Sequence, residues 1–171
     1  MRSPRQGHLA LSVIAAVAAL VLVAAPAIAA GPSAVRGGGV VGGDRGVTSQ
    51  LGFTASERGG SFLCVMAGRS GGFAFGPWDT ILQMQVQGRV TPGSLEIAGE
   101  WSSFDGVADI HVVGIADGEV LAVKLTDIPF TSRQTSGGAL EAQHVLEVDL
   151  PGPNLVIGPE YLTAGRITIS E

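Results

Sequence analysis

Hydrophobic and polar residues alternate along much of the chain beyond residue 46, with the period of two that a half-buried strand requires. The clearest case is 82–90, where Leu82, Met84 and Val86 are each followed by a glutamine. A slip of one residue would bury those glutamines, so the pattern places the three apolar side chains in the core. We predict about eight strands, over residues 47–55, 62–66, 82–90, 95–102, 110–112, 121–125, 145–150 and 167–169.

Glycine, proline and aspartate mark the breaks between these strands. Asp117-Gly118 is the strongest hairpin signal, because both central residues of a type I′ turn need positive φ. Asp105-Gly106 predicts a further turn, 131–138 a polar loop and 151–159 a longer loop. Residues 30–46 are rich in glycine and predict a flexible lead-in.

The order of strands and turns predicts an all-β domain. No segment beyond residue 46 shows a convincing helical period, and consecutive hairpins imply that sequential strands are neighbours. A meander of this size must avoid open edges. We therefore expect one antiparallel sheet that closes as an up-and-down β-barrel of about eight strands, with a β-sandwich as the alternative.

The N-terminus has the zones of a secretory signal peptide. Arg2 and Arg5 precede an uncharged run over 9–25, and Ala27 and Ala29 give the A-x-A spacing of a cleavage site. The alternative is a retained anchor, because the run is barely long enough to span a bilayer. We predict a signal-peptide helix over 1–29, a lead-in over 30–46 and the all-β domain over 47–171. The protein is then secreted or held at the cell envelope, and is free of the membrane once the signal is cleaved.

Charge narrows the range of partners. Without residues 1–29 the chain has 8 basic and 15 acidic residues, a formal net charge of −7. This excess of acidic residues argues against nucleic acid and anionic membranes as partners. The single cysteine, Cys64, cannot form a disulfide within the chain. We expect it to be a small buried side chain, with an intermolecular disulfide or a reactive thiol as alternatives.

The motifs that suggest chemistry lack the context that the chemistry needs. The segment 68–72 faintly resembles the serine motif of trypsin-like proteases, but His111 and His144 both follow Ser70 rather than precede it. Glycines in 37–42 fit a dinucleotide fingerprint without the strand and helix that it requires. Neither histidine has zinc-ligand spacing, and we expect both at the rim or surface. We predict no catalytic residue, no metal and no cofactor.

Four residues are candidates for ligand binding. Trp78, Trp101 and Tyr161 offer flat faces with polar edges, which suit sugar rings. Trp101 shares its predicted strand face with Leu95 and Ile97, which favours a place in the core, so Trp78 in its glycine-rich loop is the better candidate of the two. Met84 would line an apolar pocket if the barrel encloses one.

Several short motifs follow one another in a particular order. They are Gly37-Gly38-Gly39-Val40-Val41, Gly52-Phe53, Ala98-Gly99-Glu100 with Gly106, Asp117-Gly118-Glu119, and a Gly-x-Ile-x-Ile strand over 165–169. This order resembles the post-COAP family of secreted bacterial β-domains. The resemblance implies an exported, non-catalytic β module on or outside the bacterial cell. The His and Asp residues usual near the family's second strand are replaced here by Phe62-Leu63-Cys64-Val65, so no ligand role is carried over from them.

These features lead to three functional hypotheses. The first is a non-enzymatic secreted or surface-associated domain that binds an unknown macromolecule or serves as a structural module. The second is a carrier of a small apolar ligand, with a pocket like that of a lipocalin barrel. The third is an exported barrel enzyme, for which a histidine would have to meet Asp, Glu, Ser or Cys64 in a concave site.

Overall fold

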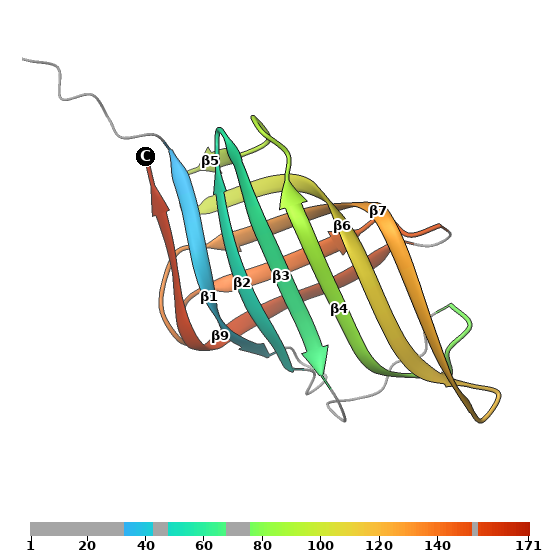
Figure 1. The fold of residues 1–171 in the computed structure, drawn as a ribbon. Helices are drawn as coiled ribbons and strands as arrows, with labels where there is room; N and C mark the ends of the chain where they lie inside the picture. Colours follow the sequence, from blue (N-terminus) through green and yellow to red (C-terminus); the bar gives the residue numbers. More distant parts are fainter. Residues whose placement is uncertain (1–32, 43–47, 68–75, 152–153) are drawn as a thin grey trace, which may run out of the picture.

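The computed structural model describes residues 33–42, 48–67, 76–151 and 154–171, and all their regular structure is β-strand (Figure 1). The predicted signal peptide and the 68–72 motif lie outside these residues. None of the described residues belongs to a helix long and apolar enough to cross a membrane. The strands are β1 (Ala34–Gly42), β2 (Thr48–Ser56), β3 (Gly59–Ala67), β4 (Thr80–Val90), β5 (Glu96–Ala98), β6 (Trp101–Ala116), β7 (Glu119–Thr135), β8 (Gln143–Val148) and β9 (Leu155–Ser170).

Eight of the strands form a closed barrel. Each of them pairs antiparallel with its neighbour in the order β1-β2-β3-β4-β6-β7-β8-β9, and β9 pairs with β1 to close the sheet. The short strand β5 pairs with the first residues of β6, outside the barrel. In Figure 1, β1 to β4 lie side by side at the front, and β7 to β9 cross behind them. The predicted up-and-down barrel is therefore confirmed, in preference to the sandwich.

The glycine-rich segment predicted as a flexible lead-in contains strand β1. It pairs along its whole length with both β2 and β9. A Cβ atom on Gly37 would lie 2.7 Å from Cγ1 of Ile167 and 2.9 Å from Cζ of Phe53. Glycine here makes room for neighbouring side chains, and this is why composition alone misled the prediction.

Three predicted breaks also fall inside strands. Asp105-Gly106 lies within β6, where Gly106 faces Phe130 of β7. The polar stretch from residue 131 continues β7 to Thr135, and β9 begins at Leu155, within the predicted 151–159 loop. In β7 the polar residues Ser132 and Gln134 point into the barrel, so the usual rule of apolar inside and polar outside fails. Asp117-Gly118 does form the predicted hairpin, with φ of 51° and 81°.

Four phenylalanines fill the middle of the barrel. Phe53 of β2 and Phe62 of β3 meet Phe104 of β6 and Phe130 of β7, from the other side of the lumen. Ring centroids are 5.5 Å apart for Phe53 and Phe104 and 4.9 Å apart for Phe62 and Phe130. All four side chains are buried. These contacts occupy the lumen at this level.

Strand β4 follows the predicted alternation only from Met84 onward. Met84 and Val86 are buried as expected, but Leu82 is 37% exposed and Ile81 takes its place in the core. The pairing of β4 with β6 shifts register between Ile81 and Gln83. Such a bulge moves the preceding residues to the opposite face, and it leaves no mark in the hydrophobic pattern.

Candidate functional site

A row of buried polar side chains crosses four strands inside the barrel. Ser102 of β6 is paired with Gln134 of β7, Gln134 with His144 of β8, and His144 with Glu160 of β9. All four residues are at most 2% exposed. The expectation that His144 lies at the rim or surface is wrong, whereas His111 is exposed. Buried polar groups need partners, so the hydrogen bonds of this row decide what it can do.

The hydrogen bonds of the row run in one direction. Ser132 Oγ donates to Gln134 Oε1 at 2.9 Å, and Gln134 Nε2 donates to Ser102 Oγ at 2.8 Å. His144 Nε2 lies 3.2 Å from Ser132 Oγ. A hydroxyl has one proton, which Ser132 gives to Gln134, so Nε2 of His144 must be the donor to Ser132.

Glu160 and His144 face each other at the other end of the row. Ser49 Oγ donates to Glu160 Oε1 at 3.3 Å, and His144 Nδ1 lies 4.0 Å from Glu160 Oε2. That distance is within the range of an ion pair but too long for a hydrogen bond, and both atoms lack a hydrogen-bond partner. Two bare lone pairs facing each other in a dry interior would repel. We therefore infer that the pair holds one proton, as an imidazolium with a carboxylate or as two neutral groups.

Cys64 lies in the same interior, 1% exposed, as predicted for a small buried side chain. Burial is the main cause that raises the pKa of the Cys64 thiol to about 12. A thiol with such a pKa is protonated at neutral pH and is a poor nucleophile. No cluster of three or more His, Cys, Asp or Glu suited to a metal occurs among the described residues.

The outer edge of β7 is open over much of its length. β8 pairs with β7 only over residues 130–134, whereas β6 pairs with β7 along its whole length. Among the described residues, 119–125 therefore have a strand neighbour on one side only. We call residues 119–125 the β7 edge.

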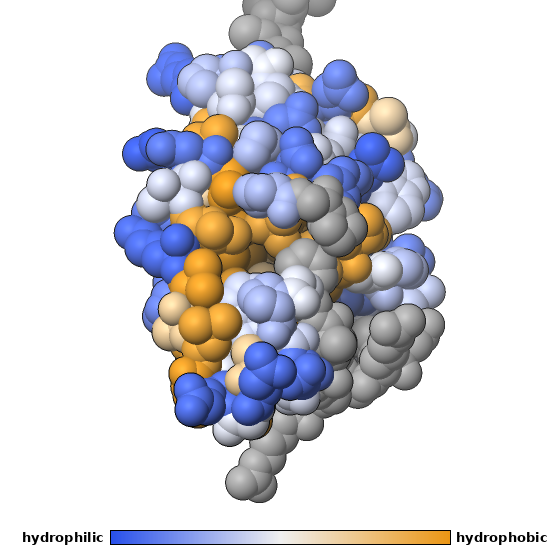
Figure 2. All heavy atoms as spheres, turned by 90° about the vertical axis from the view of Figure 1, so that its right-hand side faces the viewer, coloured by the Kyte–Doolittle hydropathy of each residue, from blue (hydrophilic) through white to orange (hydrophobic). Residues whose placement is uncertain are grey.

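Apolar side chains project from both faces of the β7 edge. Val120 is 70% exposed on the outer face. On the inner face Leu121 is 36% exposed, and Val123 and Leu125 are half-buried although they are paired with the buried Val112 and Ile110 of β6. Figure 2 views the side of the molecule where the β6–β7 hairpin lies, and it shows apolar surface around a hollow in the middle of this side. Contiguous exposed apolar surface of this kind is typical of interaction sites.

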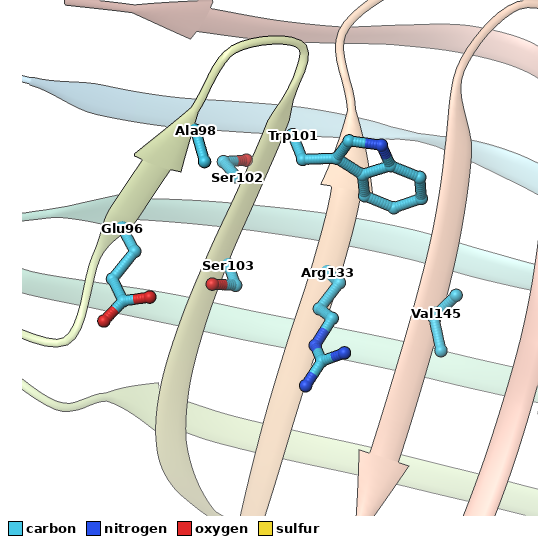
Figure 3. Close-up of a pocket in the computed structure, with 7 residues that line it drawn as sticks. All are labelled: Glu96, Ala98, Trp101, Ser102, Ser103, Arg133 and Val145. Carbon is cyan, nitrogen blue, oxygen red and sulfur yellow. The ribbon is translucent and has the colours of Figure 1, made fainter.

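A second hollow of about 390 Å³ lies on the outside of the barrel over β5 to β8. Ser103 lies on its floor, between Glu96 of β5 and Arg133 of β7. In Figure 3 the Trp101 ring extends from β6 over β7 towards β8, with Arg133 and Val145 beside it. Neither Glu96 nor Arg133 has an ion-pair partner among the described residues.

The four predicted ligand residues do not form one site. Trp78 is buried, with its Nε1 donating to Leu121 O at 3.1 Å, and Met84 is buried in the core. Trp101 is 41% exposed and Tyr161 42% exposed, both on the outer surface. The expectation that Trp101 is a core residue and Trp78 the exposed one is therefore reversed. Gly99 and Glu100 form a turn between β5 and β6, so Trp101 begins a new strand and does not continue the face of Leu95 and Ile97.

The sequence reading missed the buried row and both hollows. The alternation of Ser132 and Gln134 with outward residues was a signal for a strand, but their polarity indicated a loop. No signal marked the β7 edge, because an open edge depends on the length of a neighbouring strand. No family model matches the chain, and neither the curated proteins nor the solved structures include a match.

Proposed function

We propose that this protein is an exported, non-enzymatic binding domain that holds a partner polypeptide at the β7 edge. The predicted signal peptide and the resemblance to the post-COAP family support export and a non-catalytic role. The observation that carries the proposal is the open β7 edge with exposed apolar residues on both faces. An exposed edge strand is prone to pair with another chain, and proteins usually blunt such edges unless they serve an interaction.

The buried row favours binding over catalysis. Ser132, His144 and Glu160 are the residue types of a nucleophile, a base and an orienting acid. Ser132 nevertheless directs its proton to Gln134 and not to His144, and all three side chains are at most 2% exposed. A serine that is to be activated by histidine must give its proton to that histidine and must reach the substrate. The row instead ties four strands together.

The carrier of a small apolar ligand is the second candidate, and one observation favours it. Leu121, Val123 and Leu125 lie on the inner face of the barrel wall but are not fully buried. The four phenylalanines restrict any apolar ligand to this end of the barrel, because they fill its middle. A ligand here would be held at the mouth and not enclosed as in a wide lipocalin pocket.

Selection of peptides from a random display library on the immobilised protein tests the proposal. The peptides that are enriched are then titrated against the parent protein and two variants. Val120→Lys places a charge on the edge at a side chain that is already exposed, so folding is preserved. Trp101→Ala alters the outer hollow and is the matched control, since Trp101 lies away from the edge.

We expect the selected peptides to bind Val120→Lys about tenfold more weakly than the parent or worse, which corresponds to about 1.4 kcal/mol. Binding to Trp101→Ala should match the parent. Loss with Trp101→Ala alone would move the site to the outer hollow and overturn the proposal. Failure to select any peptide, together with saturable binding of a fluorescent fatty acid that Val120→Lys leaves unchanged, would establish the carrier in its place.

A further inference from the structure

We propose that the partner binds by strand addition: a short extended peptide with apolar residues at alternate positions pairs with the β7 edge and extends the barrel wall. This inference rests on the proposed function, and it specifies the conformation and chemistry of the partner.

The backbone of the β7 edge offers the hydrogen bonds that such a strand needs. Between Glu119 and Leu125 the pairing with β6 is regular, with Glu119 opposite Ala116 and Leu125 opposite Ile110. In a regular antiparallel strand, alternate residues direct their N–H and C=O groups away from the neighbour. β8 would meet these groups if it continued, but its pairing with β7 ends at Phe130. A strand from the partner would pair with the residues of the β7 edge that β8 is too short to reach.

The side chains at the β7 edge define the pattern of the partner. Leu121, Val123 and Leu125 share the inner face with Val112 and Ile110, which are at most 1% exposed. Alternate residues of an added strand would point to that same face and cover these half-exposed side chains. The remaining residues would point to the outer face, beside the exposed Ala122 and Lys124. Apolar residues are therefore required at every second position only.

The length of the regular β6–β7 pairing and the net charge of the chain restrict the partner peptide further. The register between β6 and β7 shifts between Ala108 and Ile110, and Asp127 on β7 has a φ of 55°. A bulge of this kind bends the strand and ends regular pairing, so the partner strand is short, about the length of residues 119–125. The whole chain has a formal net charge of −5, which favours a neutral or basic peptide over an acidic one.

Titration of the isotope-labelled protein with synthetic peptides, followed by NMR, tests the inference. The parent peptide is Thr-Val-Thr-Val-Lys-Val-Thr-Val-Thr, blocked at both ends. A scrambled peptide of the same composition lacks the alternation. Two further versions are N-methylated at alternate residues, one at the odd positions and one at the even positions. Each removes the backbone donors from one edge of the peptide and leaves the other edge intact.

Strand addition predicts that the shifted amide signals centre on residues 119–125. One N-methylated version should bind about tenfold more weakly than the parent peptide or worse, and the other within about twofold, because only one edge faces β7. The scrambled peptide should also bind more weakly. Equal binding of both N-methylated versions would overturn strand addition while leaving polypeptide binding at the edge intact. If peptides from the display selection bind the edge but the alternating peptide does not, the inferred pattern is wrong and the proposed function survives.

Discussion

His144 Nδ1 and Glu160 Oε2 lie 4.0 Å apart inside the barrel, and neither atom has a hydrogen-bond partner. The two side chains come from neighbouring strands, β8 and β9, and the ring of Phe62 from β3 stacks on the imidazole at a centroid distance of 6.1 Å. A single proton on one of the two atoms removes the repulsion between their lone pairs. Its contribution to stability therefore depends on whether one proton remains there.

Two substitutions of Glu160 show whether Nδ1 of His144 needs a hydrogen-bond donor or a negative charge beside it. Glu160→Ala leaves Nδ1 of His144 facing a cavity, and we expect a loss of about 3 kcal/mol in the free energy of unfolding. Glu160→Gln should lose much less, since its amide can donate to Nδ1 and accept from Ser49. Urea unfolding at pH 7 measures both. Equal losses for the two variants would contradict a shared proton.

Burial of the Cys64 thiol predicts a loss of stability at alkaline pH. The pKa of this thiol is raised from 9.0 to about 12, chiefly by burial, so the folded protein holds the proton more tightly than the unfolded chain does. The stabilisation is complete below pH 9 and is lost as the pH rises towards 12, by about 1.4 kcal/mol per pH unit.

The control for the alkaline loss is Cys64→Ala, which has no thiol to titrate. All other ionisable groups are the same in the two proteins, so the difference between the two unfolding free energies isolates Cys64. The advantage of the parent over Cys64→Ala should shrink between pH 9 and pH 11. A difference that stays constant over this range would show that the thiol is not protected by burial.

The sequence predicted the fold wherever local chemistry decides the structure. Asp117-Gly118 is a hairpin because its dihedral angles demand those residues, and the inward faces of β2 and β3 follow the alternation because every second residue is buried. The wrong predictions concern glycines, which can form flexible segments and turns but can also leave space for a neighbouring side chain. Gly37 and Gly106 resembled flexible or turn glycines, but they lie where Phe53 and Phe130 require space.

The candidate sites could not be predicted from the sequence for a different reason. Glu160 and Ser49 are 111 residues apart, and no local pattern shows that they meet. Trp78 and Trp101 exchanged their expected environments because Trp78 packs beside Gly114 and donates to Leu121 O, whereas a turn at Gly99 makes Trp101 the start of a new strand. The β7 edge is open because β8 is short, which is a property of the assembled sheet.

The β6–β7 hairpin provides a test of backbone conformation without side-chain crowding. A Cβ on Gly118 would have no atom within 4 Å, but its φ is 81°. Gly118→Ala should therefore destabilise the protein by about 1 kcal/mol through the backbone alone. Gly52→Ala is the matched control, because its Cβ also meets nothing within 4 Å and its φ is not positive. Urea unfolding in which both variants lose the same stability would refute the conformational cause.

Gly106 tests the opposite case, in which space and not conformation requires glycine. Its added Cβ would clash with the backbone O of Arg89 and would lie 2.5 Å from Cε1 of Phe130, and a Cβ on Gly88 would lie at the same distance from that ring atom. Both glycines are buried, so Phe130 would have to leave its place among the four phenylalanines. We expect Gly106→Ala and Gly88→Ala each to cost about 1–3 kcal/mol, against a change within about 0.5 kcal/mol for Gly52→Ala. Because both substitutions displace one ring, the double variant should lose less than the two single losses added together. Fully additive losses in urea unfolding would mean that the two glycines accommodate different neighbours, and that Phe130 does not link β4, β6 and β7 as the structure indicates.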